Sequence, residues 1–164
     1  MPLRAIYYHL GVLETVILVC SEESLRQVHL FLNICLRYER LKKQVGFLVL
    51  GCKDGRPYLH DPQTITSREP FNPDTFRTEG LEGLSFDSFD MLTHAFRHAI
   101  KKLHVKKEDI MIDITGGKKP ASVVGAAVTF NTKIKAQYVD TEGENKIRGY
   151  DVLLVSADTG GYGL

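Results

Sequence analysis

The residues best suited to chemistry lie in the segment 113–124, which reads DITGGKKPASVV. An apolar run ends at Asp113, and two glycines, two lysines and a proline follow before a series of small residues. Glycines let backbone N–H groups approach an anion closely, and the following helix directs the positive end of its dipole to the same place. The segment therefore predicts an anion-binding turn between a strand and a helix, in which Asp113 accepts hydrogen bonds from backbone N–H groups.

The residues of this turn suit a negatively charged ligand. Gly116 and Gly117 can adopt positive φ, a conformation that other residues disfavour. Thr115 offers a hydroxyl group, and Lys118 and Lys119 add positive charge. We expect these five residues to bind the ligand. A glycine-rich turn whose lysines merely face water is the alternative that the sequence leaves open.

Two familiar phosphate-binding motifs are excluded at this place. A Walker A loop needs a glycine five positions before Gly117, where Ile112 stands, and a serine or threonine where Lys119 stands. The dinucleotide fingerprint G-x-G-x-x-G is absent as well. The expected anion site is therefore not one of the common nucleotide-binding loops.

Two further loops are expected to reach the same edge of the fold. Ligands of open parallel sheets bind at the carboxyl ends of the strands. The loop 20–24 (CSEES) leaves one predicted strand and enters a helix, and the loop 51–55 (GCKDG) follows another strand. Ser21, Glu22 and Gly51 are accordingly the additional candidates for ligand binding.

The elements that position these loops follow from the spacing of apolar residues. Short β-branched runs predict strands, and apolar residues three to four apart predict helices. The order between 14 and 50 is strand, helix, strand, which implies a parallel pair. The last two strands form a hairpin. We expect an α/β fold: a Rossmann-like three-layer sandwich with a mostly parallel sheet of about five to six strands and a C-terminal hairpin. The predicted strands are 14–21, 45–50, 109–114, 135–142 and 147–156, and the predicted helices are 24–41, 86–104 and 120–131.

The length of 164 residues and a hydrophobic content of 43% fit one domain over 1–164. Four of the six prolines fall within 51–86, which is therefore expected to be a long, loop-rich insertion, either without regular structure or with a small strand pair. The last residues, 157–164, are expected to form a flexible tail. The residues before the first strand fit either a short first element or the cut end of a longer protein.

Charge and composition exclude several partners. A net charge of +1 argues against binding of a long nucleic acid, and no apolar run reaches the roughly 20 residues of a membrane span. Cys20, Cys35 and Cys52 lack metal-binding spacing and suit buried, reduced thiols, which fits a cytoplasmic location. His94 and His98 lie one helical turn apart but lack a third ligand. We therefore expect neither a metal nor a cofactor.

The motif Asp-x-Thr-Gly-Gly followed by lysine resembles the signature of the CARF family, the CRISPR-associated Rossmann-fold sensor domains. The common form there is Asp-x-Thr-Gly-Gly-Thr-Lys, and Lys118 stands where threonine is more usual. The resemblance extends loosely over most of the chain, and 113–120 is its specific part. The matching residues are Asp113, Thr115, Gly116, Gly117 and Lys119.

This resemblance implies a function. CARF domains form homodimers that bind a cyclic oligoadenylate in a two-fold cleft, so the chain would be a sensor in a type III CRISPR antiviral response. Cyclic tetra-adenylate is the expected ligand, because its two-fold symmetry matches two copies of one loop. Binding would switch on a fused or associated effector, such as a nuclease or a membrane segment, which is not recognisable in this sequence.

One alternative is a stand-alone ring nuclease that degrades its cyclic ligand. Cleavage needs the ribose 2′-hydroxyl in line with the phosphorus and stabilisation of charge at the scissile phosphate. Ser21, Thr115, Lys118 and Lys119 suit positioning and charge stabilisation, but no residue suggests a dedicated base. Binding without efficient cleavage is therefore the expectation, and the sequence assigns no catalytic residue.

A second alternative is a small nucleotide-dependent α/β transferase or hydrolase. Such an enzyme needs an acid or base near the Gly-Gly-Lys turn. Glu22, Glu23 and Asp54 are the candidates that the predicted loops supply.

Overall fold

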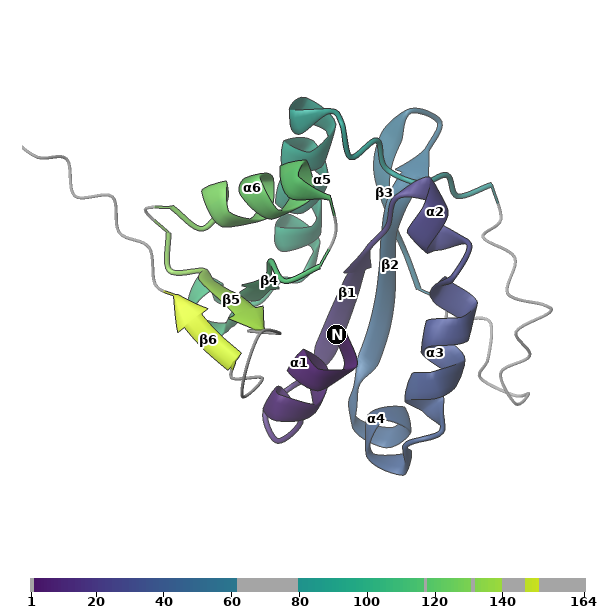
Figure 1. The fold of residues 1–164 in the computed structure, drawn as a ribbon, viewed down its shortest axis with the longest axis vertical. Coiled ribbons are helices and arrows are strands. Elements are labelled where there is room, and N and C mark those ends of the chain that lie inside the picture. Colours follow the sequence, from purple (N-terminus) through teal and green to yellow (C-terminus); the bar gives the residue numbers. More distant parts are fainter. Residues whose placement is uncertain (1, 62–79, 117, 131, 140–146, 151–164) are drawn as a thin grey trace, which may run out of the picture.

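The computed structural model describes residues 2–61, 80–116, 118–130, 132–139 and 147–150. Within these ranges the chain is an α/β protein whose strands form two three-stranded sheets, in the orders β1-β2-β3 and β4-β5-β6 (Figure 1). No helix in the described part of the chain is long and apolar enough to cross a membrane.

The first sheet combines a parallel pair with a hairpin. β1 (Thr15–Val19) pairs in parallel with β2 (Gly46–Lys53), as predicted, and β3 (Arg56–His60) returns antiparallel to β2. Asp54 and Gly55 form the turn with φ of 51° and 73°. Two successive residues with positive φ match the right-handed twist of the two strands, and Asp-Gly adopts that conformation readily.

The single helix predicted for 24–41 is divided into three. The chain forms α2 (Glu22–Leu25), α3 (Val28–Leu36) and α4 (Glu39–Gln44). The extended backbone of Tyr38, with φ −94° and ψ 110°, separates the last two. The apolar spacing predicts a stripe of Leu25, Val28, Leu32, Cys35 and Tyr38, of which the first four are buried and Tyr38 is 46% exposed. The spacing does not show where a helix ends, because no glycine or proline marks either break.

The second sheet repeats the plan of the first. β4 (Met111–Asp113) pairs in parallel with β5 (Lys135–Val139), and β6 (Ile147–Tyr150) runs antiparallel to β5. The predicted C-terminal hairpin is thereby confirmed. The predicted parts of its strands at 140–142 and 151–156 lie outside the described residues.

The remaining helices lie around the strands. α1 (Pro2–His9) is a short helix that precedes β1. α5 (Phe89–Lys102) is followed by the 3₁₀ turn η1 (Lys107–Asp109), which leads into β4. α6 (Lys119–Ala127) follows β4 and has proline in its first turn, where a helix tolerates it.

The expected single, mostly parallel sheet is not confirmed. The described strands make two mixed sheets, each with one parallel and one antiparallel pair, and β1 and β4 are not paired within the described residues. The first residues of the insertion 51–86 extend β2 and form β3, so the segment does contain a strand pair. Its middle part, 62–79, and the predicted tail 157–164 lie outside the described residues.

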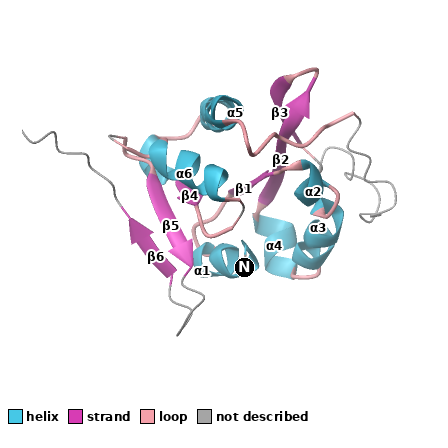
Figure 2. Ribbon diagram, turned by 45° about the horizontal axis from the view of Figure 1, so that its top comes forward, coloured by secondary structure: helices cyan, strands magenta, loops and turns pink. Residues whose placement is uncertain are grey.

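Helices cover both faces of the first sheet. Successive side chains of a strand point to opposite faces, and β1 follows this rule: Val16 and Leu18 pack with α1 to α4, whereas Ile17 and Val19 pack with α5 and α6. Figure 2 shows α2, α3 and α4 together on one side of β1 and β2, with α5 on the other. The first sheet is thus the middle of three layers.

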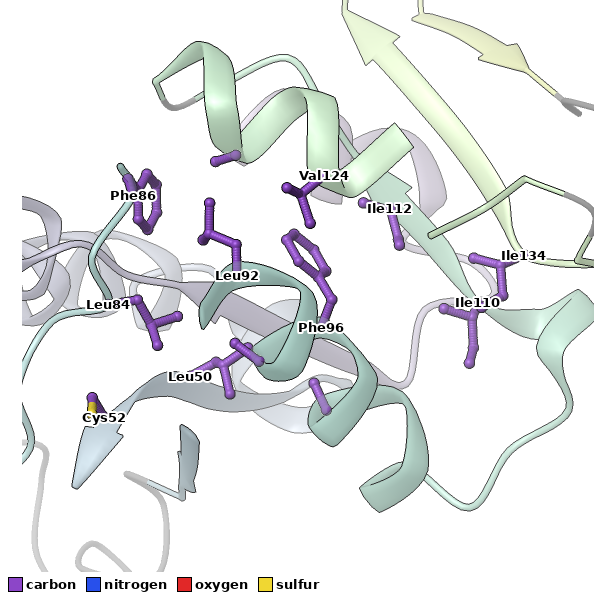
Figure 3. Close-up of a cluster of buried hydrophobic side chains, with 13 residues drawn as sticks. Leu50, Cys52, Leu84, Phe86, Leu92, Phe96, Ile110, Ile112, Val124 and Ile134 are labelled. Atoms are coloured by element: carbon purple, nitrogen blue, oxygen red, sulfur yellow. The ribbon is translucent and has the colours of Figure 1, made fainter. Parts of the chain in front are cut away.

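One apolar cluster joins the two sheets (Figure 3). Leu92 and Phe96 of α5 are buried in it together with Leu50 from β2. Ile112 from β4 and Val124 from α6 complete it on the side of the second sheet. Because one helix packs against both sheets, the carboxyl ends of β1 and β4 are attached to the same core.

Candidate functional site

The turn after β4 is held by its own strand and by β5. Asp113 Oδ1 accepts a hydrogen bond from the Thr115 N–H at 2.8 Å, which confirms the predicted role of this aspartate. Its other oxygen, Oδ2, accepts from Gln137 Nε2 at 3.2 Å. The Thr115 hydroxyl oxygen accepts from the backbone N–H of Val139 at 2.7 Å. Since the hydroxyl accepts this bond, its hydrogen remains available for another acceptor.

α6 holds the turn from a third side. The Ser122 hydroxyl lies 3.1 Å from the carbonyl oxygen of Ile114 and 3.5 Å from that of Gly116, and it donates to them. Ile114 also donates its N–H to the Gln137 carbonyl at 2.9 Å. The backbone at 114–116 is therefore positioned before any ligand arrives.

Lys118 and Lys119 lie where this turn enters α6. Lys118 is the residue before the helix, with an extended backbone of φ −70° and ψ 150°, and Lys119 is the first helical residue. Both side chains are exposed. Pro120 has no N–H, and Ala121 and Ser122 donate theirs to the Lys118 carbonyl. An anion here would therefore depend on the lysine side chains and the amides of the turn more than on the helix end.

The structure describes one of the two glycines of the motif, Gly116, for which positive φ was expected. Gly116 does not adopt positive φ, so that part of the prediction is wrong for this residue. A Cβ atom at Gly116 would meet no heavy atom within 4 Å, and the position is exposed. The fold itself consequently does not require glycine there. Gly117 lies outside the described residues.

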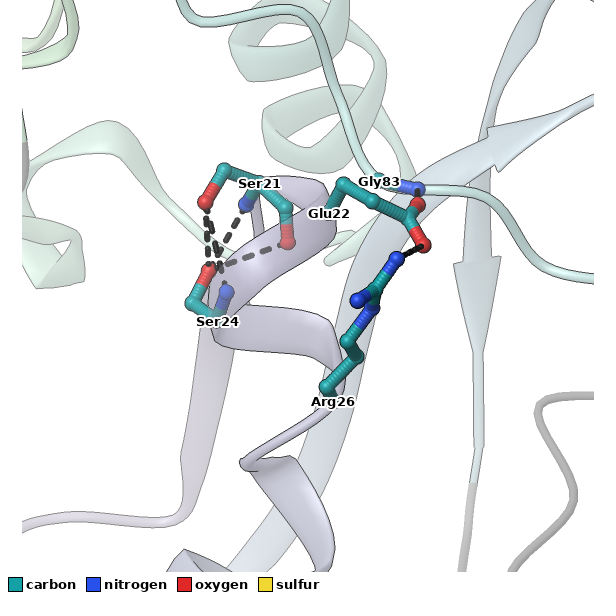
Figure 4. Close-up of polar contacts among 5 residues, drawn as sticks. All are labelled: Ser21, Glu22, Ser24, Arg26 and Gly83. Atoms are coloured by element: carbon teal, nitrogen blue, oxygen red, sulfur yellow. Dashed lines mark hydrogen bonds and ion pairs between the residues drawn. The ribbon is translucent and has the colours of Figure 1, made fainter.

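Ser21 and Glu22 begin α2, where both have structural partners (Figure 4). The Ser21 hydroxyl accepts from the Ser24 N–H at 3.3 Å, and Ser24 Oγ accepts from the Ser21 N–H at 2.7 Å. Glu22 Oε2 accepts from the Gly83 N–H at 2.9 Å, and Oε1 lies 3.5 Å from Arg26 Nη2. The reciprocal serine bonds are a capping box, which stabilises the first turn of a helix.

Gly51 is buried beneath the segment 81–84. A Cβ atom at Gly51 would lie 2.7 Å from the Glu82 carbonyl oxygen. Glu82 and Cys52 exchange two backbone hydrogen bonds of 2.8 Å, and the Leu84 N–H donates to the Cys20 carbonyl at 2.8 Å. The segment 81–84 thus spans the carboxyl ends of β1 and β2, and Gly51 provides the room for it.

The predicted site residues therefore form two groups. Ser21, Glu22 and Gly51 gather around 81–84, while Thr115, Gly116, Lys118 and Lys119 gather between β4, β5 and α6. Both groups are attached to one core, because Ile17, Val19 and Ile114 pack against the same cluster. The second group combines a positioned backbone with exposed positive charge, which is the arrangement that recognises a phosphate.

Sequence reasoning missed the residues that hold the turn, namely Val139, Ser122, Gln137 and His9. Gln137 is 4% exposed, and its Oε1 lies 2.6 Å from Nε2 of His9 on α1. The available signal was a polar residue inside the apolar strand KAQYV. A buried amide needs hydrogen-bond partners, and those partners are expected to be specific.

Among the described residues, no three or more potential metal-ligating side chains lie together, so His94 and His98 have no third ligand there. Comparison with models of protein families, with curated proteins and with solved structures finds no significant match. Function must therefore be inferred from the residues and their geometry.

Proposed function

We propose that the chain binds a cyclic oligoadenylate, most readily cyclic tetra-adenylate, at the turn 115–119, and that it is the sensor part of a type III CRISPR antiviral response. The observation that carries this proposal is the turn itself. Asp113 and Ser122 hold its backbone at 114–116 and Val139 holds the Thr115 hydroxyl, while Lys118 and Lys119 remain exposed. A backbone that is already positioned loses little further entropy on binding, and the lysines supply the positive charge.

A homodimer would present two copies of this turn to one ligand. Two copies supply four lysines, and a ring of four adenylates carries four phosphates arranged with two-fold symmetry. An isologous dimer places the same residues on both sides of its axis, so each turn would contact an equivalent half of the ring. A fused or associated effector would respond to the bound state. Since the ligand is small, a local patch suffices in a chain whose net charge is +1.

The two sheets are, in this proposal, halves of one Rossmann-like layer in the order β3-β2-β1-β4-β5-β6. Their shared cluster around α5 supports this arrangement. In such an order the direction of the strand sequence reverses between β1 and β4, and ligands bind outside the carboxyl ends at that point. Ser21 follows β1 and Thr115 follows β4. Ser21 would then line the ligand site from the opposite side.

Binding without cleavage fits the described side chains better than an enzyme does. The Glu22 carboxylate, a candidate base, accepts from the Gly83 N–H and pairs with Arg26. The Glu22 carboxylate must break these contacts before it can take a proton. Asp54 lies in the turn of the β2–β3 hairpin. The proposal therefore assigns no catalytic residue.

Titration calorimetry of the full chain tests this function. The ligands are cyclic tri-, tetra- and hexa-adenylate, with linear tetra-adenylate and ATP as controls. We expect cyclic tetra-adenylate to bind more tightly than either control. Absence of heat with every cyclic species, or equal affinity for the linear chain and ATP, would contradict the proposal. Chromatography of the ligand after hours with the protein is expected to recover intact rings, and linear products would instead identify a ring nuclease.

A matched pair of variants locates the site. Replacing Lys118 and Lys119 together by alanine is expected to weaken binding by at least about tenfold, since each lysine contributes a charge-assisted contact. Lys101 and Lys102 form a similar exposed pair at the end of α5 and serve as the control. Equal losses from both double variants would mean that binding reflects charge alone.

A further inference from the structure

We infer that Gln137 is a positioning residue for the start of the turn, residues 113–116, and that it couples this backbone to α1 through His9. Gln137 lies on β5 and is 4% exposed. Its amide lies between two side chains: Nε2 is 3.2 Å from Asp113 Oδ2, and Oε1 is 2.6 Å from His9 Nε2. Asp113 in turn accepts from the Thr115 N–H. Three hydrogen bonds in series thus connect α1 with the turn.

The orientation of the amide follows from its neighbours. A carboxylate has only acceptor oxygens, so Gln137 must direct its NH₂ group to Asp113. Its carbonyl oxygen is then left to accept from His9, which must carry a proton on Nε2. Reversing the amide would face oxygen with oxygen at Asp113, so this carboxylate sets the orientation and the tautomer of His9 follows from it. The bond to His9 then satisfies the buried Gln137 oxygen and holds the amide in place.

α1 connects the two halves of the fold. Ile6, 7% exposed, is buried in the cluster that α1 to α4 share with the first sheet, together with Phe47 and Leu41. His9, on the same helix, contacts Gln137 of the second sheet. A displacement of the turn that moved Asp113 would therefore be transmitted to a helix anchored in the other half of the protein. Under the function proposed above, on which this ligand-dependent part rests, α1 would report whether the site is occupied.

Loss of His9 should loosen the turn at a distance. Without a donor at position 9, the buried Gln137 oxygen becomes unsatisfied, and the amide can shift toward another donor while its NH₂ group still faces Asp113. Asp113 moves with the amide and is then held less firmly beside the Thr115 N–H. If His9 only filled space, His9→Phe would leave the turn unchanged, because the phenylalanine ring would occupy the same volume.

Amide hydrogen exchange of the ligand-free full chain, resolved by residue, tests the coupling without any ligand. In His9→Phe we expect Thr115 N–H to exchange about five- to tenfold faster than in the wild type, with the amides of β2 unchanged. His9→Gln, which can supply an N–H donor, should restore slow exchange. His94→Phe, a change at an exposed histidine of α5, is the control and should leave Thr115 unchanged. Rates at Thr115 within about twofold of wild type in His9→Phe would overturn the inference.

The ligand arm separates the two proposals. If cyclic tetra-adenylate binds, exchange in α1 of the wild type should change on binding, and this response should disappear in His9→Phe. Binding without any response of α1 would overturn the ligand-dependent coupling but leave the proposed function intact. Absence of binding would contradict the proposed function, and the ligand-free comparison would still decide whether His9 positions the turn.

Discussion

Val139 donates its backbone N–H to the hydroxyl oxygen of Thr115 at 2.7 Å, so the last residue of β5 holds the turn that leaves β4. The same threonine donates its own N–H to Asp113. Thr115, expected from the sequence to serve a ligand, is therefore also a structural residue that joins two neighbouring strand ends.

Replacing Thr115 by valine keeps the shape of the side chain and removes the hydroxyl. The Val139 N–H then loses its acceptor in a partly buried place, and we expect the free energy of unfolding to fall by about 1–2 kcal/mol. Thr115→Ser retains the hydroxyl, and its free energy of unfolding should fall markedly less than that of Thr115→Val. Urea unfolding of the three proteins measures the difference, and equal losses in the two variants would exclude a role for the hydroxyl.

Gly116 separates the requirements of the fold from those of the ligand. Because a Cβ atom there meets nothing within 4 Å and φ is not positive, Gly116→Ala should change the free energy of unfolding by less than about 0.5 kcal/mol. If the turn binds phosphate through its backbone, the added methyl group obstructs that approach and affinity should fall about tenfold or more. Calorimetry measures the affinity for cyclic tetra-adenylate, and urea unfolding measures the stability. An unchanged affinity in Gly116→Ala would mean that the ligand does not bind at this backbone.

Gly83 should behave in the opposite way. A Cβ atom there would lie 1.9 Å from the Glu22 backbone nitrogen and 2.2 Å from its Cα, where only backbone movement could make room. We expect Gly83→Ala to lower the free energy of unfolding by about 3 kcal/mol, the upper part of the range for overpacking. Gly11→Ala is the matched control, since its Cβ would meet no atom within 4 Å. Similar stability of the two variants in urea would show that 81–84 does not pack closely on α2.

Two buried thiols make stability fall at alkaline pH. Burial raises the pKa of Cys20 from 9.0 to about 12, despite a hydrogen bond with Ser24 that lowers it, and burial raises the pKa of Cys35 to about 11. The unfolded chain ionises these thiols near pH 9, whereas the folded protein keeps them protonated. Their contribution to the free energy of unfolding is thus complete below about pH 9 and is lost as the pH rises through the folded pKa values.

The variant Cys20→Ala isolates this effect. Between pH 8 and pH 10.5 the free energy of unfolding should fall about 1–2 kcal/mol less in this variant than in the wild type. The comparison of two slopes removes the tyrosines and lysines that titrate in the same range. Identical pH dependence in both proteins would mean that Cys20 ionises as easily in the folded state as in the unfolded one.

Much of the fold could be predicted because its signals are local. Short apolar, β-branched runs predicted the strands of the parallel pair β1–β2, and spacing of three to four residues predicted α5. Small residues that follow a proline predicted α6. The break at Tyr38 carries no such signal. The Tyr38 ring packs edge-on against Tyr7 of α1, with the ring centroids 5.1 Å apart. The helix break therefore coincides with a contact between segments that are distant in the sequence.

The small strand pair allowed for within 51–86 is present as the β2–β3 hairpin, but the bounds of β3 were not predicted, because proline favours a loop. Pro57 pairs with Cys52 in the register of the hairpin, and β3 is the outer strand of the described sheet. An outer strand tolerates a residue without an N–H group, since one side of it makes no ladder bonds. Composition alone does not distinguish such a strand from an irregular segment.

The candidate site shows the same division. The bond from Thr115 N–H to Asp113 spans two residues and could be predicted from the motif. The bond between His9 and Gln137 spans 128 residues, and no local pattern predicts such a pairing. The residues that offer charge were therefore accessible to sequence analysis, whereas those that hold the turn became visible only in the folded chain.

Native mass spectrometry of the full chain with cyclic tetra-adenylate tests the central claim most directly, because it reports the number of chains and ligands in one complex. The account predicts a complex of two chains with one ligand, which is lost when Lys118 and Lys119 are both replaced by alanine and is retained when Lys101 and Lys102 are. Spectra that show only ligand-free chains with every cyclic oligoadenylate, or one ligand on each single chain, would contradict it.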